Sequence, residues 1–157
     1  MANLPVLLDD LDRRILNALQ ADAAQTNNEL AEMVHASPPT CLRRVKRLTE
    51  TGVIERRVAI VAPGKVGATL TAIVEITLDV QTGERQADFE ALMATEPAVL
   101  QCYRVSPGPD FVLIVQVSDM PAYHAFAHRM FSAHANVRNV RSFFATHRSK
   151  FETRIPV

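Results

Sequence analysis

The densest cluster of positive charge in this chain is the short run Arg43-Arg44-Val45-Lys46-Arg47. Although the whole chain is formally neutral, residues 40–60 contain six basic and two acidic side chains, and residues 1–39 contain two basic and six acidic ones. Arginine can bond a phosphate or the edge of a guanine with its planar fork. The run therefore fits a DNA contact, although a merely solvated helix face would have the same composition.

The flanking residues predict that this run lies on a helix. Ser37 is a favourable N-cap, Pro38 suits the first helical position, and Gly52 suits a left-handed C-cap after about Thr51. At about 100° per residue, one side of the helix is apolar and should face a core: Cys41, Leu42, Val45 and Leu48. The opposite side should face DNA: Thr40, Arg43 and Arg47, flanked by Arg44 and Lys46.

Two shorter helices are expected before it. Leucine and isoleucine recur at helical spacing from Leu8 to Leu19, and Thr26 with Glu29 forms a capping-box pattern before a helix ending near Val34. His35 and Ala36 would form the following turn, in which His35 adopts a left-handed conformation only at some strain. Three such helices predict a helix-turn-helix that lays the third helix in the major groove.

A wing is expected after the third helix. Val53 to Val61 is rich in β-branched residues and predicts a strand or ribbon, which Ala62-Pro63-Gly64 ends. We therefore expect a DNA-binding domain over residues 1–62 and a second domain over residues 63–157. The candidate DNA contacts combine the start of the third helix, its cations and two arginines of the wing: Ser37, Pro38, Pro39, Thr40, Arg43, Arg44, Lys46, Arg47, Arg56 and Arg57.

The second domain has a different pattern. Strands are expected at 70–78, 99–106, 111–118 and 137–147, with helices at 83–95 and 121–134. This βαββαβ order predicts a ferredoxin-like sandwich with both helices on one face of an antiparallel sheet, and an α+β fold for the chain. A dense cluster of turn-forming residues, Ser106-Pro107-Gly108-Pro109-Asp110, joins the two middle strands.

Three motifs carry a family resemblance: Leu11-Asp12-x-x-Ile15-Leu16, Asn28-Glu29-Leu30-Ala31, and Ser37-Pro38-x-x-Cys41-Leu42-Arg43-Arg44-Val45. The chain resembles the Lrp/AsnC, or leucine-responsive, regulators from about Leu8 to its end. The resemblance implies a transcriptional regulator whose second half is a RAM domain, similar to the ACT domain. It also implies dimers formed through the sheets, larger assemblies such as octamers, and an amino-acid effector bound between RAM domains of neighbouring dimers.

The resemblance places the effector site at the 106–110 turn, at the start of the second RAM helix and on the last strand. The corresponding residues are Ser106, Gly108, Asp110, Met120, Ser142, Phe143 and Phe144. Asp110 could pair a ligand ammonium, or it could simply cap the turn; Met120 and Phe143 could equally be core residues. Pro107 and Pro109 depart from the family loop and remove two N–H donors, so the choice of ligand stays open.

Other classes of protein receive less support. His124 and His128 have a spacing that can hold zinc, but no third ligand is evident, and neither Cys41 nor Cys102 has a histidine neighbour in the sequence. We therefore expect no enzyme, no metal and no cofactor, and reduced cysteines in a cytoplasmic protein without a membrane partner. An architectural protein that packages DNA without sequence preference, and a metal-responsive regulator, remain alternatives.

Overall fold

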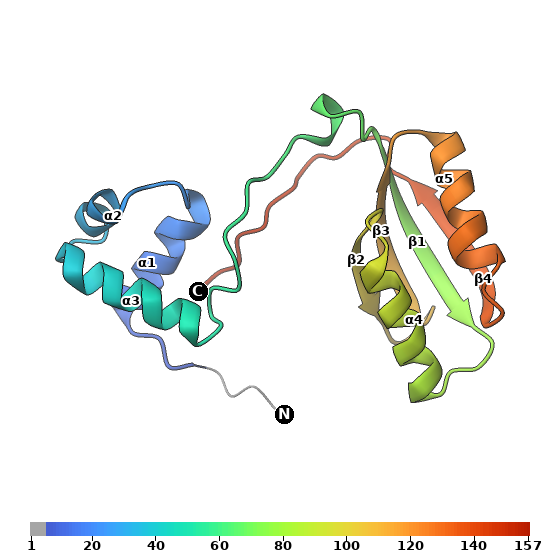
Figure 1. Ribbon diagram of the computed structural model, residues 1–157, viewed down its shortest axis with the longest axis horizontal. Coiled ribbons are helices and arrows are strands. Elements are labelled where there is room, and N and C mark those ends of the chain that lie inside the picture. The colour runs from blue at the N-terminus through green and yellow to red at the C-terminus, as the bar shows by residue number, and fades with distance from the viewer. Residues whose placement is uncertain (1–5) are drawn as a thin grey trace. The chain divides into compact units, whose positions relative to one another are not determined.

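A computed structural model describes residues 6–157, which divide into two units (Figure 1). The first comprises Met1–Ile60 together with Lys150–Val157, and the second comprises Val61–Ser149. None of the helices described in either unit is long and apolar enough to cross a membrane.

The first unit contains the three predicted helices, α1 (Asp10–Ala21), α2 (Asn27–Met33) and α3 (Pro38–Glu50). The predicted capping box of α2 is confirmed, because Thr26 and Glu29 satisfy each other's backbone N–H groups. Ser37 is the N-cap of α3 as predicted, but its hydroxyl donates to Thr40 Oγ1 at 2.8 Å instead of capping the backbone. The three helices bury one apolar core: Ile15, Leu16, Ala18, Leu30, Ala31, Val34, Cys41 and Leu48.

Two residues with a left-handed backbone conformation set the directions in which the chain enters and leaves α3. His35 has a φ of 54° and Gly52 a φ of 73°, which for Gly52 confirms the predicted left-handed C-cap. A residue with a Cβ adopts this left-handed backbone conformation only at an energetic cost, and glycine adopts it without that cost. The α2–α3 turn therefore carries backbone strain at His35 that the end of α3 avoids.

The predicted strand over Val53–Val61 is wrong for this chain. Residues 55–62 are extended but belong to no ladder among residues 6–157. β-branched residues favour extended backbone, but a strand also needs a partner for its N–H and C=O groups.

The C-terminal residues return to the first unit, which the sequence did not lead us to expect. Gln20 and Ile155 exchange two hydrogen bonds, with Gln20 Nε2 donating at 3.0 Å and the Ile155 N–H donating at 2.9 Å. Val157 packs against the helical core. The tail therefore extends the apolar core of the helix-turn-helix.

The second unit has the predicted βαββαβ order. Its elements are β1 (Leu70–Leu78), α4 (Gly83–Thr95), β2 (Val99–Arg104), β3 (Phe111–Val117), α5 (Met120–Ala127) and β4 (Val137–Phe144), with a 3-10 turn at Pro63–Lys65 and a π-turn at His128–Ser132. The strands form one antiparallel sheet in the order β2-β3-β1-β4. Figure 1 shows α4 and α5 on the same face of this sheet, as predicted for a ferredoxin-like sandwich.

Alternation along the strands separates a covered face from an open one. The covered face packs Val74, Ile76 and Leu113 against Phe89 of α4 and Phe126 of α5, all of them buried. Burying each such side chain contributes about 1.5 to 3 kcal/mol. The open face carries Ile73, Val112, Ile114, Tyr103 and Phe143, of which Ile73 is 39%, Tyr103 53% and Phe143 44% exposed. This domain thus has an apolar sheet face that no helix of residues 6–157 covers.

Candidate nucleic-acid interface and effector loop

The two sides of α3 differ in burial. Cys41 and Leu48 are fully buried and Val45 is half-buried, whereas Arg43 and Lys46 are exposed. Leu42 was expected to face the core, and this is wrong, because it is 61% exposed. It lies about 100° from Cys41 around the helix axis and so falls outside the packed side. The exposed face therefore presents Leu42 among the cations.

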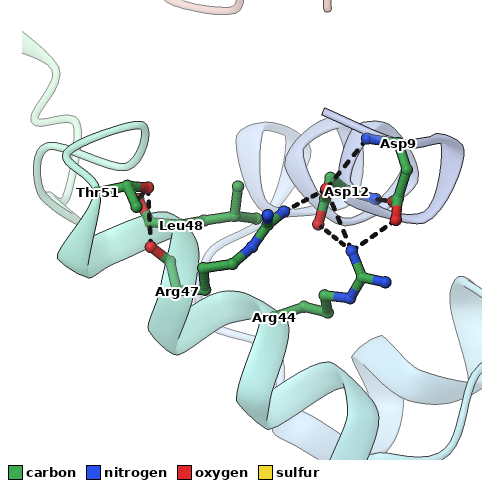
Figure 2. Close-up of polar contacts among 6 residues, drawn as sticks. All are labelled: Asp9, Asp12, Arg44, Arg47, Leu48 and Thr51. Atoms are coloured by element: carbon green, nitrogen blue, oxygen red, sulfur yellow. Dashed lines mark hydrogen bonds and ion pairs between the residues drawn. The ribbon is translucent and has the colours of Figure 1, made fainter. Parts of the chain in front are cut away.

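Arg44 and Arg47 do not project freely from α3; they reach back to two aspartates of α1 (Figure 2). Arg44 Nη1 donates to Asp9 Oδ2 at 2.6 Å and to the two carboxylate oxygens of Asp12 at 3.2 and 3.3 Å. Arg47 Nη2 also donates to Asp12 Oδ2. The Asp12 side chain is only 1% exposed and that of Asp9 is 52% exposed. One buried carboxylate thus fastens two arginines of the basic run.

The charges of this cluster are mutually stabilised. The Asp12 backbone N–H, followed by the Arg44 side chain, lowers the pKa of the Asp9 carboxyl below its usual value. The hydrogen bond to Asp9 is the largest influence that raises the pKa of Arg44. Both groups are therefore charged at neutral pH.

The role of Asp12 was not predicted. Asp9, Asp10 and Asp12 fit the start of a helix, where negative charge is favourable. A signal was nevertheless present, because Asp12 lies three and four positions before Ile15 and Leu16 and so shares their apolar side. An acid within an apolar stripe requires a cationic or donor partner.

Arg43, Arg44 and Arg47 together line a shallow cavity of about 370 Å³. Among residues 6–157, the Arg43 guanidinium has no hydrogen-bond or ion-pair partner, and Lys46 Nζ lies 3.7 Å from Glu50 in an exposed pair. Exposed pairs of that kind contribute little and are easily exchanged. Arg43 and Lys46 are thus the cations of α3 most available to an anion.

The remaining predicted DNA contacts lie on either side of this face. Ser37, Pro38 and Pro39 are exposed at the start of α3 and Thr40 is half-buried, while Asn27 Nδ2 of α2 donates to the Pro38 carbonyl at 2.9 Å. Arg56 and Arg57 are exposed in the extended segment that follows α3.

Asp110 connects the 106–110 turn to neighbouring residues through its side chain and its backbone N–H. Asp110 is buried, and its Oδ2 accepts from the Leu78 N–H at 2.7 Å and from Gln81 Nε2 at 3.1 Å. The Asp110 N–H donates to the Ile76 carbonyl at 2.8 Å. Asp110 therefore fixes the turn to the end of β1, as a turn-capping aspartate would.

Few donors of the turn remain for a ligand. Pro107 and Pro109 have no N–H, and the amides of Ser106 and Gly108 have no partner within the part of the chain that the structure describes. Gly108 has a φ of 125°, which glycine adopts without strain. Arg104, at the end of β2 before the turn, donates two hydrogen bonds to Glu90 at 2.8 and 3.0 Å.

The predicted effector residues on β4 lie beside the middle and the first half of β1, away from the end of β1 that the turn adjoins. Ser142 pairs with Val74 and Phe144 with Ala72 of β1, whereas the turn adjoins Ile76 and Leu78. Ser142 Oγ and the Tyr123 hydroxyl are 2.5 Å apart, and the Phe144 and Tyr123 rings meet edge to face at 4.9 Å.

Met120 and Phe143 also lie apart from the turn. Met120 is 38% exposed at the start of α5, and Phe143 lies on the open face of the sheet. One chain therefore does not bring the predicted effector residues together in a single pocket.

The residues considered for catalysis or metal binding are not assembled into a site. Cys41 and Cys102 are both free thiols, and burial raises the pKa of each. A raised pKa disfavours the reactive thiolate. No group of three or more histidine, cysteine or acidic residues could hold a metal ion among residues 6–157.

The two units match models of known protein families. Residues 8–55 match a winged helix-turn-helix DNA-binding model, and residues 71–155 match the Lrp/AsnC ligand binding domain. A helix-turn-helix followed by a ligand-binding sandwich defines a class of DNA-binding transcriptional regulators that respond to small molecules.

Relatives are similar over nearly the whole chain. A transcriptional regulator of Haemophilus influenzae is 42% identical over 94% of this chain and 88% of its own length. The Escherichia coli transcriptional activator DecR is 33% identical over 96% of this chain and 99% of its own. The leucine-responsive regulatory protein of Salmonella typhimurium is 33% identical over 96% of this chain and 92% of its own length. These relatives are named as regulators and not as enzymes.

Solved structures of regulators also match this chain over nearly its whole length. An AsnC family regulator from Agrobacterium tumefaciens has a TM-score of 0.90 at 38% identity and covers 95% of this chain and 97% of that chain. A Neisseria meningitidis regulator in complex with L-methionine has a TM-score of 0.89 at 31% identity, covering 96% and 97%. The chain belongs to the Lrp/AsnC family and is a DNA-binding transcriptional regulator of that type.

Proposed function

We propose that the exposed face of α3 reads DNA in the major groove through Arg43, with Lys46 and the start of the helix contacting phosphates. The observation that carries this proposal is the free Arg43 guanidinium on a helix whose other side is packed into the core. A bidentate arginine contact to guanine discriminates between bases by about 1 to 3 kcal/mol. Arg56 and Arg57 would add flanking phosphate contacts, which position the protein without choosing a sequence.

The experiment is selection of preferred duplexes from a random pool by the full chain, followed by footprinting of the selected sequence. We expect half-sites whose centres lie about one helical turn apart, since each copy offers one reading helix. Uniform protection of every duplex, with no selected sequence, would instead support the architectural alternative.

The open face of the sheet is our candidate for the dimer interface. Its apolar residues Ile73, Ile114 and Phe143 are flanked by a Glu75–Arg141 ion pair of 3.2 Å. A second copy would cover this face by the same residues, as a twofold interface requires. Further association into an octamer would follow from contacts between dimers.

We also propose that an amino acid binds between copies of the second domain and modulates assembly or DNA affinity. The amides of Ser106 and Gly108 could hold a ligand carboxylate. Met120, Ser142 and Phe144 of a neighbouring copy would surround its side chain, because one copy does not assemble both groups. The match to a ligand-binding domain model supports this proposal.

Thermal denaturation of the full chain with each of the twenty amino acids tests the effector. A ligand that binds only the folded state raises its stability, so at least one amino acid should raise the melting temperature. If none of the twenty does so, the effector proposal is refuted while the DNA-binding proposal stands.

Together these proposals assign DNA binding to residues 1–62. They assign effector binding and assembly to residues 63–157, in a cytoplasmic protein that is not an enzyme.

A further inference from the structure

The cluster formed by Asp9, Asp12, Arg44 and Arg47 has one buried partner and one accessible partner (Figure 2). Arg44 contacts both aspartates through the same nitrogen, and its side chain is 26% exposed. Asp12 is enclosed, so its contacts to both arginines hold α1 against α3. Asp9 is half exposed at the N-cap of α1, and it bonds Arg44, which lines the cavity together with Arg43 and Arg47.

The Asp9 carboxylate occupies the position where an anion would be expected. It presents an anionic oxygen to Arg44 at 2.6 Å, which is the contact that a phosphate oxygen makes with a guanidinium. Two arginines and two aspartates give the cluster a formal charge of zero, and removing the charge of Asp9 would give +1. The charge offered to DNA is therefore set by Asp9 as well as by the arginines.

We propose that Asp9 competes with DNA for Arg44: in the free protein it takes the place of a backbone phosphate, and on binding Arg44 exchanges Asp9 for the phosphate while Asp12 keeps hold of the cluster. The proposal rests on the proposed function of α3. It makes Asp9 a determinant of DNA affinity, because the ion pair between Asp9 and Arg44 must break when DNA binds.

Asp9 is suited to this role for two reasons. Its other carboxylate oxygen, Oδ1, accepts from the Asp12 N–H at 2.9 Å, so the side chain remains anchored as the N-cap when Arg44 leaves. The Asp12 carboxylate cannot take part in the exchange in the same way, because it is buried and also bonded to Arg47. The exchange therefore costs one exposed ion pair, a contact of low net value.

The test compares Asp9→Asn with Asp10→Asn in the full chain. Asparagine is as good an N-cap as aspartate, so Asp9→Asn removes the charge and keeps the cap. Asp10→Asn removes the same charge one residue later from a side chain with no ion pair among the described residues. Affinity for a fixed, unselected duplex is measured over a tenfold range of salt, and the fold is checked by circular dichroism.

Removing the competing carboxylate should raise the DNA affinity by about the value of one exposed ion pair. We therefore expect Asp9→Asn to bind the duplex about twofold to fivefold more tightly than the wild type. Because Arg44 contacts the same phosphate in both complexes, the dependence of log K on log salt, about 0.9 for each phosphate contact, should stay the same. Asp10→Asn should gain less affinity than Asp9→Asn. In Arg44→Gln the additional Asp9→Asn substitution should raise the affinity no more than Asp10→Asn does, because the competed arginine is absent.

Equal affinities for Asp9→Asn and Asp10→Asn would overturn the inference, as would weaker binding by Asp9→Asn, which would make Asp9 an orienting residue for Arg44. Arg43→Ala separates this failure from failure of the proposed function. If Arg43→Ala reduces binding but the Asp9 and Asp10 variants behave alike, only the inference falls. If neither the wild type nor any variant binds DNA, both fall.

Discussion

Replacing Asp12 by asparagine tests whether the buried carboxylate stabilises the helix-turn-helix. The amide keeps an oxygen that can accept from the Asp9 N–H, a contact of 3.1 Å in the structure. It loses the negative charge that faces Arg44 and Arg47. Each charge-assisted hydrogen bond then becomes a weaker one, at a cost of about 1 kcal/mol per arginine.

We therefore expect Asp12→Asn to lower the free energy of unfolding of the first unit by about 2 kcal/mol. This is less than the 3 to 5 kcal/mol typical of a broken buried ion pair, because the Arg44 and Arg47 side chains are 26% and 42% exposed. With a denaturant slope of about 1 to 3 kcal/mol/M, the urea midpoint should decrease by about 1 M. Asp10→Asn is the matched control and should change stability by a few tenths of a kcal/mol.

The chain offers a way to assign the effect to one unit. It has no tryptophan, and its two tyrosines, Tyr103 and Tyr123, both lie in the second unit. Tyrosine fluorescence therefore reports the second unit, whereas far-ultraviolet circular dichroism reports the helices of both. A loss below about 0.5 kcal/mol in the helical transition, or an equal shift in both signals, would refute the assignment of Asp12 to the stability of the first unit.

Three further predictions concern other parts of the chain. His35→Gly should raise the free energy of unfolding by about 1 kcal/mol, since glycine relieves the positive φ of 54°; an unchanged urea midpoint would contradict this. The pKa values of Asp9 and Glu29 are lowered, chiefly by the backbone N–H groups they accept from, so their stabilisation is full at neutral pH and is lost as the pH falls below about 4. Glu29→Gln should weaken that acid dependence in circular dichroism. If the open face forms the proposed dimer, Ile73→Glu should give a monomer in a solution mass measurement, whereas Val80→Glu, an exposed apolar control, should not.

Much of the fold follows from local sequence. Thr26 and Glu29, three residues apart, form the capping box that starts α2. Gly52 adopts its left-handed conformation without strain because it has no side chain. The order of the strands and helices in the second unit also follows from local patterns, and it predicted the sandwich with both helices on one face of the sheet. These features depend on residues within one turn or one strand of each other.

The misjudged features depend on partners distant in the chain. Val53 to Val61 has the residue types of a strand but lacks a partner within its own unit, and the contact between Gln20 and Ile155 joins opposite ends of the sequence. Leu42 lies at the edge of the α3 core side, where small differences in packing decide its burial. Spacing along α3 also could not show that Arg44 is paired with α1.

The arrangement of the candidate effector residues likewise depends on partners distant in the chain. The sequence correctly indicated a tight turn at residues 106–110, and burial of Asp110 with two donors agrees with a structural role. The separation between this turn and Ser142 depends on strand register, which local composition does not determine.

The central claim is that Arg43 on the exposed face of α3 reads base edges. Its most direct test is the affinity of wild type and Arg43→Ala for a selected duplex and for a scrambled duplex of equal length, at one fixed salt concentration. We predict that Arg43→Ala weakens binding to the selected duplex by about tenfold to a hundredfold and changes binding to the scrambled duplex much less. An equal loss on both duplexes, or no loss on either, would contradict the claim.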